Sequence, residues 1–118
     1  MQMIIFNQMV KYDAHLDSIF HSLSDPIRRD ILHLVAASEY SISELVSHYN
    51  ISFVATAKHI RVLEKADLII KRKEGKKYMI ALAPDALKLA DEYVEQYRKM
   101  WQSRHDKLEA LLKAKELT

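Results

Sequence analysis

The sequence predicts a mainly helical α+β fold for this 118-residue chain, and three observations support that class. The chain contains one glycine and two prolines, so few positions interrupt regular structure. Apolar residues recur at helical spacing over most of its length. Between residues 69 and 82 the apolar period changes to two, which is typical of β-strands. At this length we expect one domain.

The first two helices are expected to begin at aspartates. Asp13 can cap a helix over residues 13–23, in which apolar residues recur at helical spacing. Asp25 followed by Pro26 combines a capping residue with proline at the first helical position. The second helix should end near Ser38, where the apolar pattern stops.

A third and a fourth helix follow closely. The short third helix can start after Ser41, which has capping-box spacing to Glu44, or after Ser43. Ser52 can cap a fourth helix over residues 53–66. Two helices joined by so short a turn predict a helix-turn-helix, whose second helix enters the major groove of DNA.

The fourth helix is predicted to have one buried and one exposed side. At 100° per residue its inner side comprises Ala55, Thr56, His59, Ile60, Val62, Leu63 and Ala66. The opposite side comprises Val54, Ala57, Lys58, Arg61, Glu64 and Lys65. His59 is therefore interpreted as a packed, hydrogen-bonded core histidine.

A basic hairpin is expected after the fourth helix. The segments 69–73 and 77–82 are rich in β-branched or aromatic residues, and Glu74-Gly75 between them suits a tight turn in which glycine supplies a positive φ. The stretch KRKEGKKY at residues 71–78 becomes the tip of a two-stranded β wing. The expected architecture is a winged helix-turn-helix.

The last element is predicted to be a long helix over about residues 85–115. Its apolar stripe is longer than a small core can cover, so a second copy of the chain is the expected partner, with the first helix at 13–23 contributing. The expected dimer-interface residues are Leu16, Ile19, Phe20, Tyr93, Val94, Tyr97, Met100, Trp101, Leu108, Leu111 and Leu112.

Positive charge is confined to one part of the chain. Residues 1–51 have three Lys/Arg against six Asp/Glu (−3), residues 52–83 have eight against three (+5), and residues 84–118 have seven of each (0). Such asymmetry is typical of polyanion binding. Arg28 and Arg29 lie outside the basic segment and are expected to pair with neighbouring acids.

Several classes of protein are not supported. No stretch reaches the roughly 20 apolar residues that span a bilayer, and the N-terminus does not resemble a secretory signal, so a cytoplasmic location is expected. With no cysteine there is no disulfide or thiolate ligand. His105 and Glu109 share a helix face, but two ligands do not make a metal site. No catalytic motif appears, so we expect no enzyme, no metal and no cofactor.

Three motifs of the sequence resemble those of a known family. LSDPIRRDIL at 23–32, KHIRVLEKADLI at 58–69 and the KRKEGKKY wing are similar to ArsR/SmtB-type winged helix-turn-helix transcriptional regulators, in particular to the subgroup without metal-binding cysteines. The resemblance covers about residues 10–112. It implies a homodimer that binds palindromic operator DNA and represses transcription until an effector, which the sequence does not identify, releases it.

The sequence departs from the family pattern at three places. Ser41-Ile42-Ser43 replaces the Cys-Val-Cys of the metal site, and serine hydroxyls are poor substitutes for thiolates. Asp67 replaces the glycine that usually ends the fourth helix, although Asp can adopt the left-handed conformation. Ala57 replaces a serine on the expected base-facing surface.

The resulting hypothesis is a single winged-helix domain over residues 9–118, with residues 1–8 as a disordered extension. Its partners are double-stranded DNA and a second copy of itself. The expected DNA-binding residues are Ser52, Val54, Ala57, Lys58, Arg61, Lys65, Lys71, Arg72, Lys73, Lys76 and Lys77. The alternative is a winged-helix protein–protein interaction module without sequence-specific DNA binding.

Overall fold

The computed structural model describes residues 13–116. The predicted extension over residues 1–8 lies outside the described residues. The chain divides into two compact units, one ending at Leu87 and the other beginning at Lys88. Among the described residues, the first unit contains four helices and three strands, and the second contains one helix.

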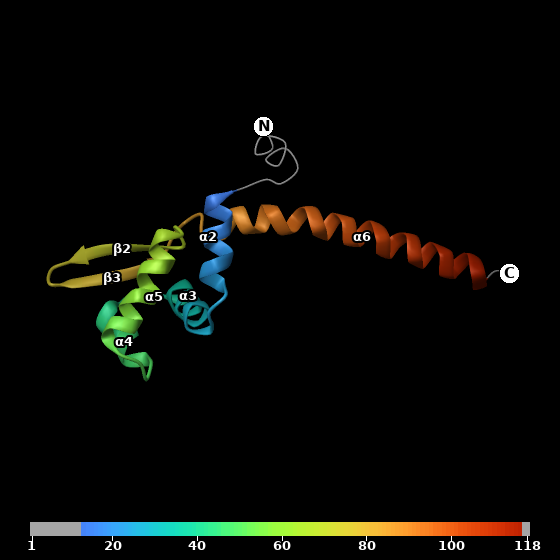
Figure 1. Ribbon diagram of the computed structural model, residues 1–118. Coiled ribbons are helices and arrows are strands. Elements are labelled where there is room, and N and C mark those ends of the chain that lie inside the picture. Colours follow the sequence, from blue (N-terminus) through green and yellow to red (C-terminus); the bar gives the residue numbers. More distant parts are fainter. Residues whose placement is uncertain (1–12, 117–118) are drawn as a thin grey trace, which may run out of the picture. The chain divides into compact units, whose positions relative to one another are not determined.

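The helices of the first unit begin where the sequence predicts (Figure 1). They are α2 (Ala14–Leu23), α3 (Pro26–Ala37), α4 (Ile42–His48) and α5 (Phe53–Lys65). Asp13 caps α2 by accepting a hydrogen bond from the amide of Leu16 at 3.0 Å. Asp25 caps α3 by accepting from the amides of Ile27 and Arg28 at 2.9 and 3.1 Å. Both predicted caps are confirmed.

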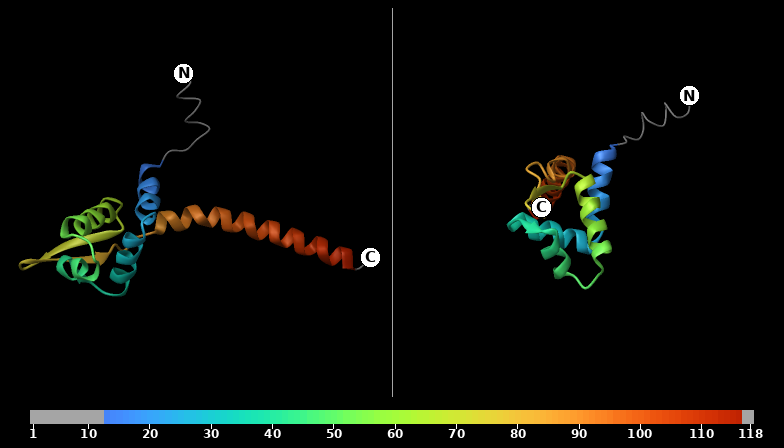
Figure 2. Two further views of the ribbon diagram at one scale, coloured as in Figure 1. Left: turned by 60° about the horizontal axis from the view of Figure 1, so that its bottom comes forward. Right: turned by 90° about the vertical axis from the view of Figure 1, so that its left-hand side faces the viewer.

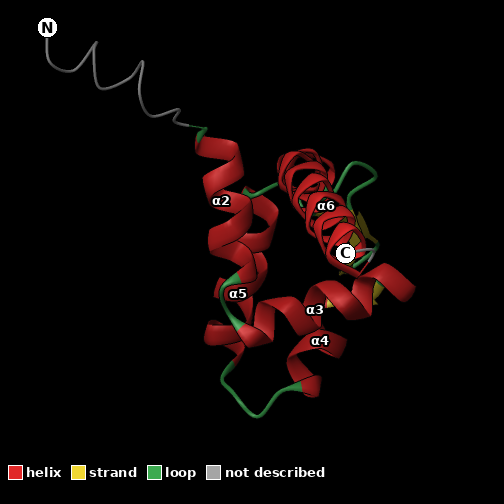
Figure 3. Cartoon of the chain, turned by 90° about the vertical axis from the view of Figure 1, so that its right-hand side faces the viewer, coloured by secondary structure: helices red, strands yellow, loops and turns green. Residues whose placement is uncertain are grey.

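The start of α4 settles the choice between two serines in favour of Ser41. Its hydroxyl accepts from the amide of Glu44 at 3.1 Å, and the Glu44 carboxylate accepts from the amide of Ser41 at 3.0 Å. This reciprocal pair is a complete capping box. Figure 3 shows the short loop that then joins α4 to α5.

The sheet contains one strand that the sequence does not predict. β2 (Ile69–Glu74) and β3 (Lys77–Leu82) form the expected antiparallel hairpin, and β1 (Tyr40–Ser41) pairs with the other edge of β3. The strand order is therefore β1-β3-β2. Figure 2 shows the hairpin extending beyond the helices of this unit.

The hairpin turn lies one residue later than predicted. Glu74 pairs with Lys77, so the two loop residues are Gly75 and Lys76 rather than Glu74 and Gly75. Gly75 has a φ of 62°, and Lys76 does not have a positive φ. Positive φ at the first loop residue alone matches a type II′ turn, whose twist suits antiparallel strands.

The core of the first unit lies between its helices and the sheet. Ile31, Leu45, Leu63 and Ile80 are completely buried, and they come from α3, α4, α5 and β3. Fully burying a side chain of this size contributes about 1.5–3 kcal/mol. Ile19 of α2 is only 2% exposed, so the prediction that it lies in a dimer interface is wrong: its side chain is part of this core.

The C-terminus of α5 ends in a left-handed residue, as the sequence allows. Asp67 has a φ of 59°. The amide of Leu68 donates to the carbonyl of Leu63 at 3.1 Å, and that of Asp67 donates to the carbonyl of Glu64 at 3.0 Å. These two bonds form a Schellman motif, and the buried side chains of Leu63 and Leu68 supply its usual apolar contact.

The second unit is helix α6 (Lys88–Glu116), of 29 residues and roughly 43 Å. It begins three residues later than the predicted position 85. Leu87 has a φ of 68°, which is left-handed and interrupts any helix that starts at Pro84 or Asp85. None of the helices within residues 13–116 is long and apolar enough to cross a membrane.

Candidate nucleic-acid interface

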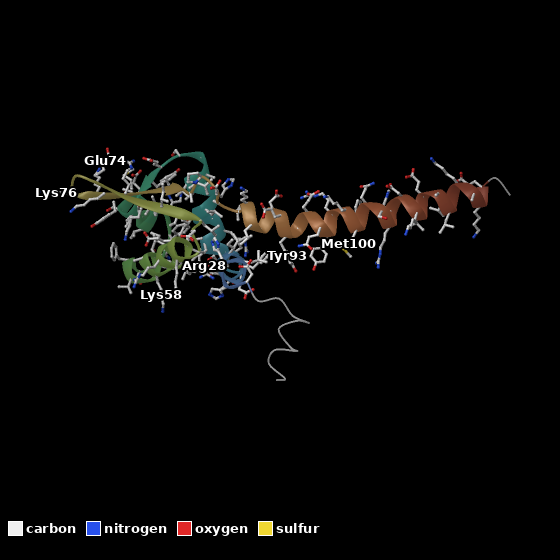
Figure 4. The ribbon with its side chains drawn as sticks, turned by 90° about the horizontal axis from the view of Figure 1, so that it is seen from above. Arg28, Lys58, Glu74, Lys76, Tyr93 and Met100 are labelled. Atoms are coloured by element: carbon white, nitrogen blue, oxygen red, sulfur yellow. The ribbon has the colours of Figure 1, made fainter. Side chains whose placement is uncertain are left out.

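The outward side of α5 carries the predicted DNA-binding residues. Lys58, Arg61 and Lys65 are exposed, and the labelled Lys58 in Figure 4 points away from the rest of its unit. Val54 is 70% exposed and Ala57 is half-buried. On the inner side Thr56, Ile60, Leu63 and Ala66 are buried. The predicted division of this helix into two sides is confirmed.

An apolar residue at the start of α5 is not among the predicted DNA-binding residues. Phe53 is 60% exposed, and it lies directly after Ser52, whose hydroxyl caps the helix by accepting from the amide of Ala55 at 3.1 Å. Phe53 and Val54 thus form an exposed apolar pair at the N-terminus of the helix. Its position could have identified Phe53 from the sequence, because the first residues of the second helix of a helix-turn-helix contact DNA.

A half-buried arginine of α3 connects this helix to α2 and to α5. Arg28 Nε donates to the carbonyl of Ser22 at 2.7 Å, and Nη2 donates to the carbonyl of His21 at 3.0 Å. Its Nη1 lies 3.2 Å from His59 Nδ1. Because a guanidinium only donates, Nδ1 must be the acceptor. Arg28 thus has the structural role that the sequence predicts: it joins the end of α2 to the middle of α5, and its charge also acts on the nearby carboxylate of Asp25.

The same junction contains Asp25. Burial acts to raise the pKa of its carboxyl, but the hydrogen bonds from the amides of Arg28 and Ile27 and the nearby charge of Arg28 act in the opposite direction and prevail. The pKa of Asp25 therefore lies below its usual value. Asp25 Oδ2 is 3.7 Å from His59 Nδ1. His59 is thus the packed, hydrogen-bonded histidine that the helix projection predicts.

The wing places five exposed cations beyond the core. Figure 4 shows Glu74 and Lys76 at the free end of the hairpin. The ammonium group of Lys71 lies 5.2 Å from the ring centre of Tyr78. Arg72 forms ion pairs with Glu39 at 2.5 Å and with Glu74 at 3.4 Å. All the residues that the sequence predicts to bind DNA lie in the first unit.

The predicted dimer residues of α6 form an exposed stripe. Its members include Tyr93, Val94, Tyr97, Met100, Trp101, Leu108, Leu111 and Leu112, all between 37% and 68% exposed. The Tyr93 and Tyr97 hydroxyls are 3.2 Å apart, and Trp101 stacks on His105. Figure 4 labels Tyr93 and Met100 on this helix.

One group of side chains on α6 has the chemistry of metal ligands. His105, Asp106 and Glu109 offer one atom each within 4.8 Å of one another. Asp106 adds a third ligand to the pair noted in the sequence. All three are exposed, and Asp106 also accepts a hydrogen bond from Gln102 at 3.0 Å. Exposed groups of this kind are common on helices and do not define a metal site.

The short turn between α4 and α5, followed by the β2–β3 hairpin, defines a winged helix-turn-helix protein. Comparisons with known proteins agree with this class. The profile described as "Bacterial regulatory protein, arsR family" matches residues 25–71, which extend from the cap of α3 into β2. The chain is 26% identical to an ArsR-like transcriptional regulator from Rhodococcus sp. RHA1, with a TM-score of 0.71 over 86% of this chain and 93% of that one.

Two curated relatives are similar in sequence. The transcriptional repressor SdpR of Bacillus subtilis (strain 168) is 30% identical over 60 residues, which are 51% of this chain and 67% of that protein. The arsenical resistance operon repressor of Staphylococcus xylosus is 34% identical over 67 residues, which are 57% and 64% respectively. The alignments thus span about two thirds of each relative. The chain belongs to the ArsR family of bacterial regulatory proteins.

Proposed function

We propose that this chain acts in the cytoplasm as a homodimeric repressor that binds a palindromic DNA operator. One observation carries the proposal: Lys58, Arg61 and Lys65 form an exposed basic stripe on the second helix of a helix-turn-helix, beside a basic wing. Both curated relatives carry the name repressor, which supports the direction of regulation.

The side chains of α5 suit base recognition. Arg61 can bond O6 and N7 of guanine together, and such a contact contributes about 1–3 kcal/mol of discrimination against another base. Lys58 and Lys65 can contact phosphates or guanine. Val54 and Ala57 have the size and apolar character for contact with thymine methyl groups. The wing lysines, as contacts to phosphate, would add affinity without reading sequence.

A selection from randomised duplexes tests DNA recognition. At about 0.15 M salt, where non-specific binding is weak, we expect enrichment of two inverted half-sites about one helical turn, or a multiple of it, apart. Arg61→Ala should mainly reduce discrimination between selected and random duplexes, whereas Lys76→Ala should weaken both equally. Indifference to both substitutions would contradict DNA binding through this surface. Added protein should lower transcription in vitro from a promoter that contains the selected site.

The homodimer is supported by the apolar stripe of α6. Eight large apolar residues remain exposed along one helix, and contiguous exposed apolar surface of this kind marks a site of interaction with another protein. Trp101→Glu places a charge in the stripe and should dissociate the dimer in sedimentation velocity experiments. Gln102→Glu, an exposed substitution on the opposite side of the helix, is the control and should leave the mass unchanged. If the wild-type protein sediments as a monomer at every protein concentration tested, this part of the proposal is refuted.

A second candidate function rests on Phe53 and Val54. Their exposed fractions of 60% and 70% at the start of α5 would also suit a contact with an apolar groove of another protein. In that case the selection would enrich no sequence. Phe53→Ser would then leave the weak binding to random DNA unchanged.

A further inference from the structure

The two faces of the wing differ in what they contain. Side chains alternate across a strand, and the register places Lys71 opposite Ile80 and Lys73 opposite Tyr78. Ile69 and Ile80 are buried on the face that packs against the helices. Lys71 and Lys73 follow Ile69 at intervals of two, so they extend that same face beyond the core.

Arg72 lies on the opposite face, among acids. Its Nη2 is 2.5 Å from Glu39 Oε2, and its Nη1 is 3.4 Å from Glu74 Oε2. Two carboxylates thus share one guanidinium. Within residues 13–116, by contrast, no carboxylate lies within 4.0 Å of the ammonium groups of Lys71, Lys73 or Lys76.

The contact between Arg72 and Glu39 crosses the middle strand. Arg72 is in β2, Glu39 directly precedes β1, and β3 lies between these two strands. The two outer strands are roughly 9.5 Å apart, which is twice the usual strand spacing. The ion pair therefore connects the edge strand of the wing to the segment between α3 and α4.

We propose that Arg72 is a positioning residue that holds the wing through Glu39, and that Lys71 and Lys73, on the helix-facing side, contact the DNA phosphates. The inference deepens the proposed function and rests on it for the DNA contacts. The Arg72 guanidinium is already paired with two carboxylates, so it is poorly placed to bind a phosphate as well. Lys71 and Lys73 have no carboxylate partner among the described residues. The wing would thus contact DNA through one face and be held in place through the other.

The holding role is tested first without DNA. Glu39 and Arg72 are about half exposed, and exposed pairs of this kind couple weakly, which corresponds to about a 1.5- to 5-fold effect. We expect Glu39→Gln and Arg72→Gln each to speed amide hydrogen exchange in β2 and β3 by such a factor, with the double variant no faster than Arg72→Gln alone. Glu74→Gln removes the same charge at the longer contact and should have a smaller effect. Additive effects of the two substitutions would overturn the holding role.

The DNA contacts are tested by exchanging the charges. The double variant Glu39→Arg/Arg72→Glu keeps the net charge and the ion pair, so it should bind a random duplex at low salt within about twofold of wild type. If Arg72 contacts phosphate instead, the introduced carboxylate repels DNA, and affinity should fall more than about tenfold. Glu39→Gln should bind more weakly than Glu74→Gln, because both remove one negative charge and the first loosens the wing more.

Salt dependence separates the cations individually. Lys73→Ala should reduce the slope of log affinity against log salt by about 0.9 per lost contact, and Arg72→Gln should leave it unchanged. An equal reduction by both would overturn the assignment. If the wild-type chain binds no duplex at low salt, the proposed function fails, while the exchange measurements still decide whether Arg72 holds the wing.

Discussion

Asp67 provides a quantitative test of how α5 ends. Its φ of 59° would cost an ordinary side chain roughly 1–2 kcal/mol, and glycine avoids that cost. Glycine in turn makes the unfolded chain more flexible, which offsets about 0.4–1 kcal/mol. The His15–Asp67 contact at 3.5 Å joins two exposed side chains and contributes little. We therefore expect Asp67→Gly to stabilise the protein by about 0.5 kcal/mol.

Thermal unfolding at a fixed protein concentration measures this change. For 118 residues the entropy of unfolding is about 0.25 kcal/mol/K, so the Tm should rise by about 2 °C. Asp67→Ala keeps the Cβ atom in the left-handed region and loses the local hydrogen-bonding capacity of aspartate, so its Tm should fall. His15 Nε2 also lies 3.0 Å from the carbonyl of Ala66, so the comparison is repeated in a His15→Ala background. If Asp67→Gly raises the Tm in neither background, the reasoning from backbone strain is refuted.

Further substitutions test hydrogen bonds within the first unit: Arg28→Met, Ser41→Ala and Glu44→Gln, with controls at Arg29 and Ser43. Arg28→Met removes three hydrogen bonds at a half-buried junction and should cost about 2–3 kcal/mol in urea unfolding, whereas Arg29→Met removes one exposed bond and should cost under about 1 kcal/mol. Ser41→Ala should cost about 0.5–2 kcal/mol, and Ser43→Ala should be nearly neutral because it caps nothing. The pKa of Glu44 is lowered from 4.5, chiefly by the amide of Ser41, so its contribution to stability is present above that pH and is lost as the pH falls through the lowered pKa. Glu44→Gln should flatten this acid limb, and an unchanged limb would contradict the assignment.

Local signals predicted the helices well because caps act over three or four residues. Asp25 with Pro26 and Ser52 each identified a helix start from neighbouring residues alone. The apolar period likewise identified the buried side of α5, which the positions of Thr56 and Ile60 confirm. These features depend on short-range geometry, which the order of residue types specifies directly.

The features that the sequence did not reveal depend on distant partners. β1 is two residues long, and Tyr40 becomes a strand residue only because Ile80 lies beside it. The left-handed Leu87 moves the start of α6, although leucine carries no signal for that conformation. The ion pair between Arg72 and Glu39 joins residues 33 positions apart. Periodicity can assign Arg72 to a strand, but it cannot show which carboxylate it meets.

The strand order has a consequence for the solubility of the protein. Within the part of the chain that the structure describes, β2 pairs with a strand on one side only, so its outer edge presents unpaired amides and carbonyls to which a strand of another molecule could add. Consecutive long cations at Lys71, Arg72 and Lys73 oppose such addition, because a second copy would bring the same charges alongside. These charges thereby protect the outer edge of β2 against pairing with a second copy of the wing. A chain with all three replaced by alanine is expected to aggregate, so experiments on this wing need single or charge-conserving substitutions.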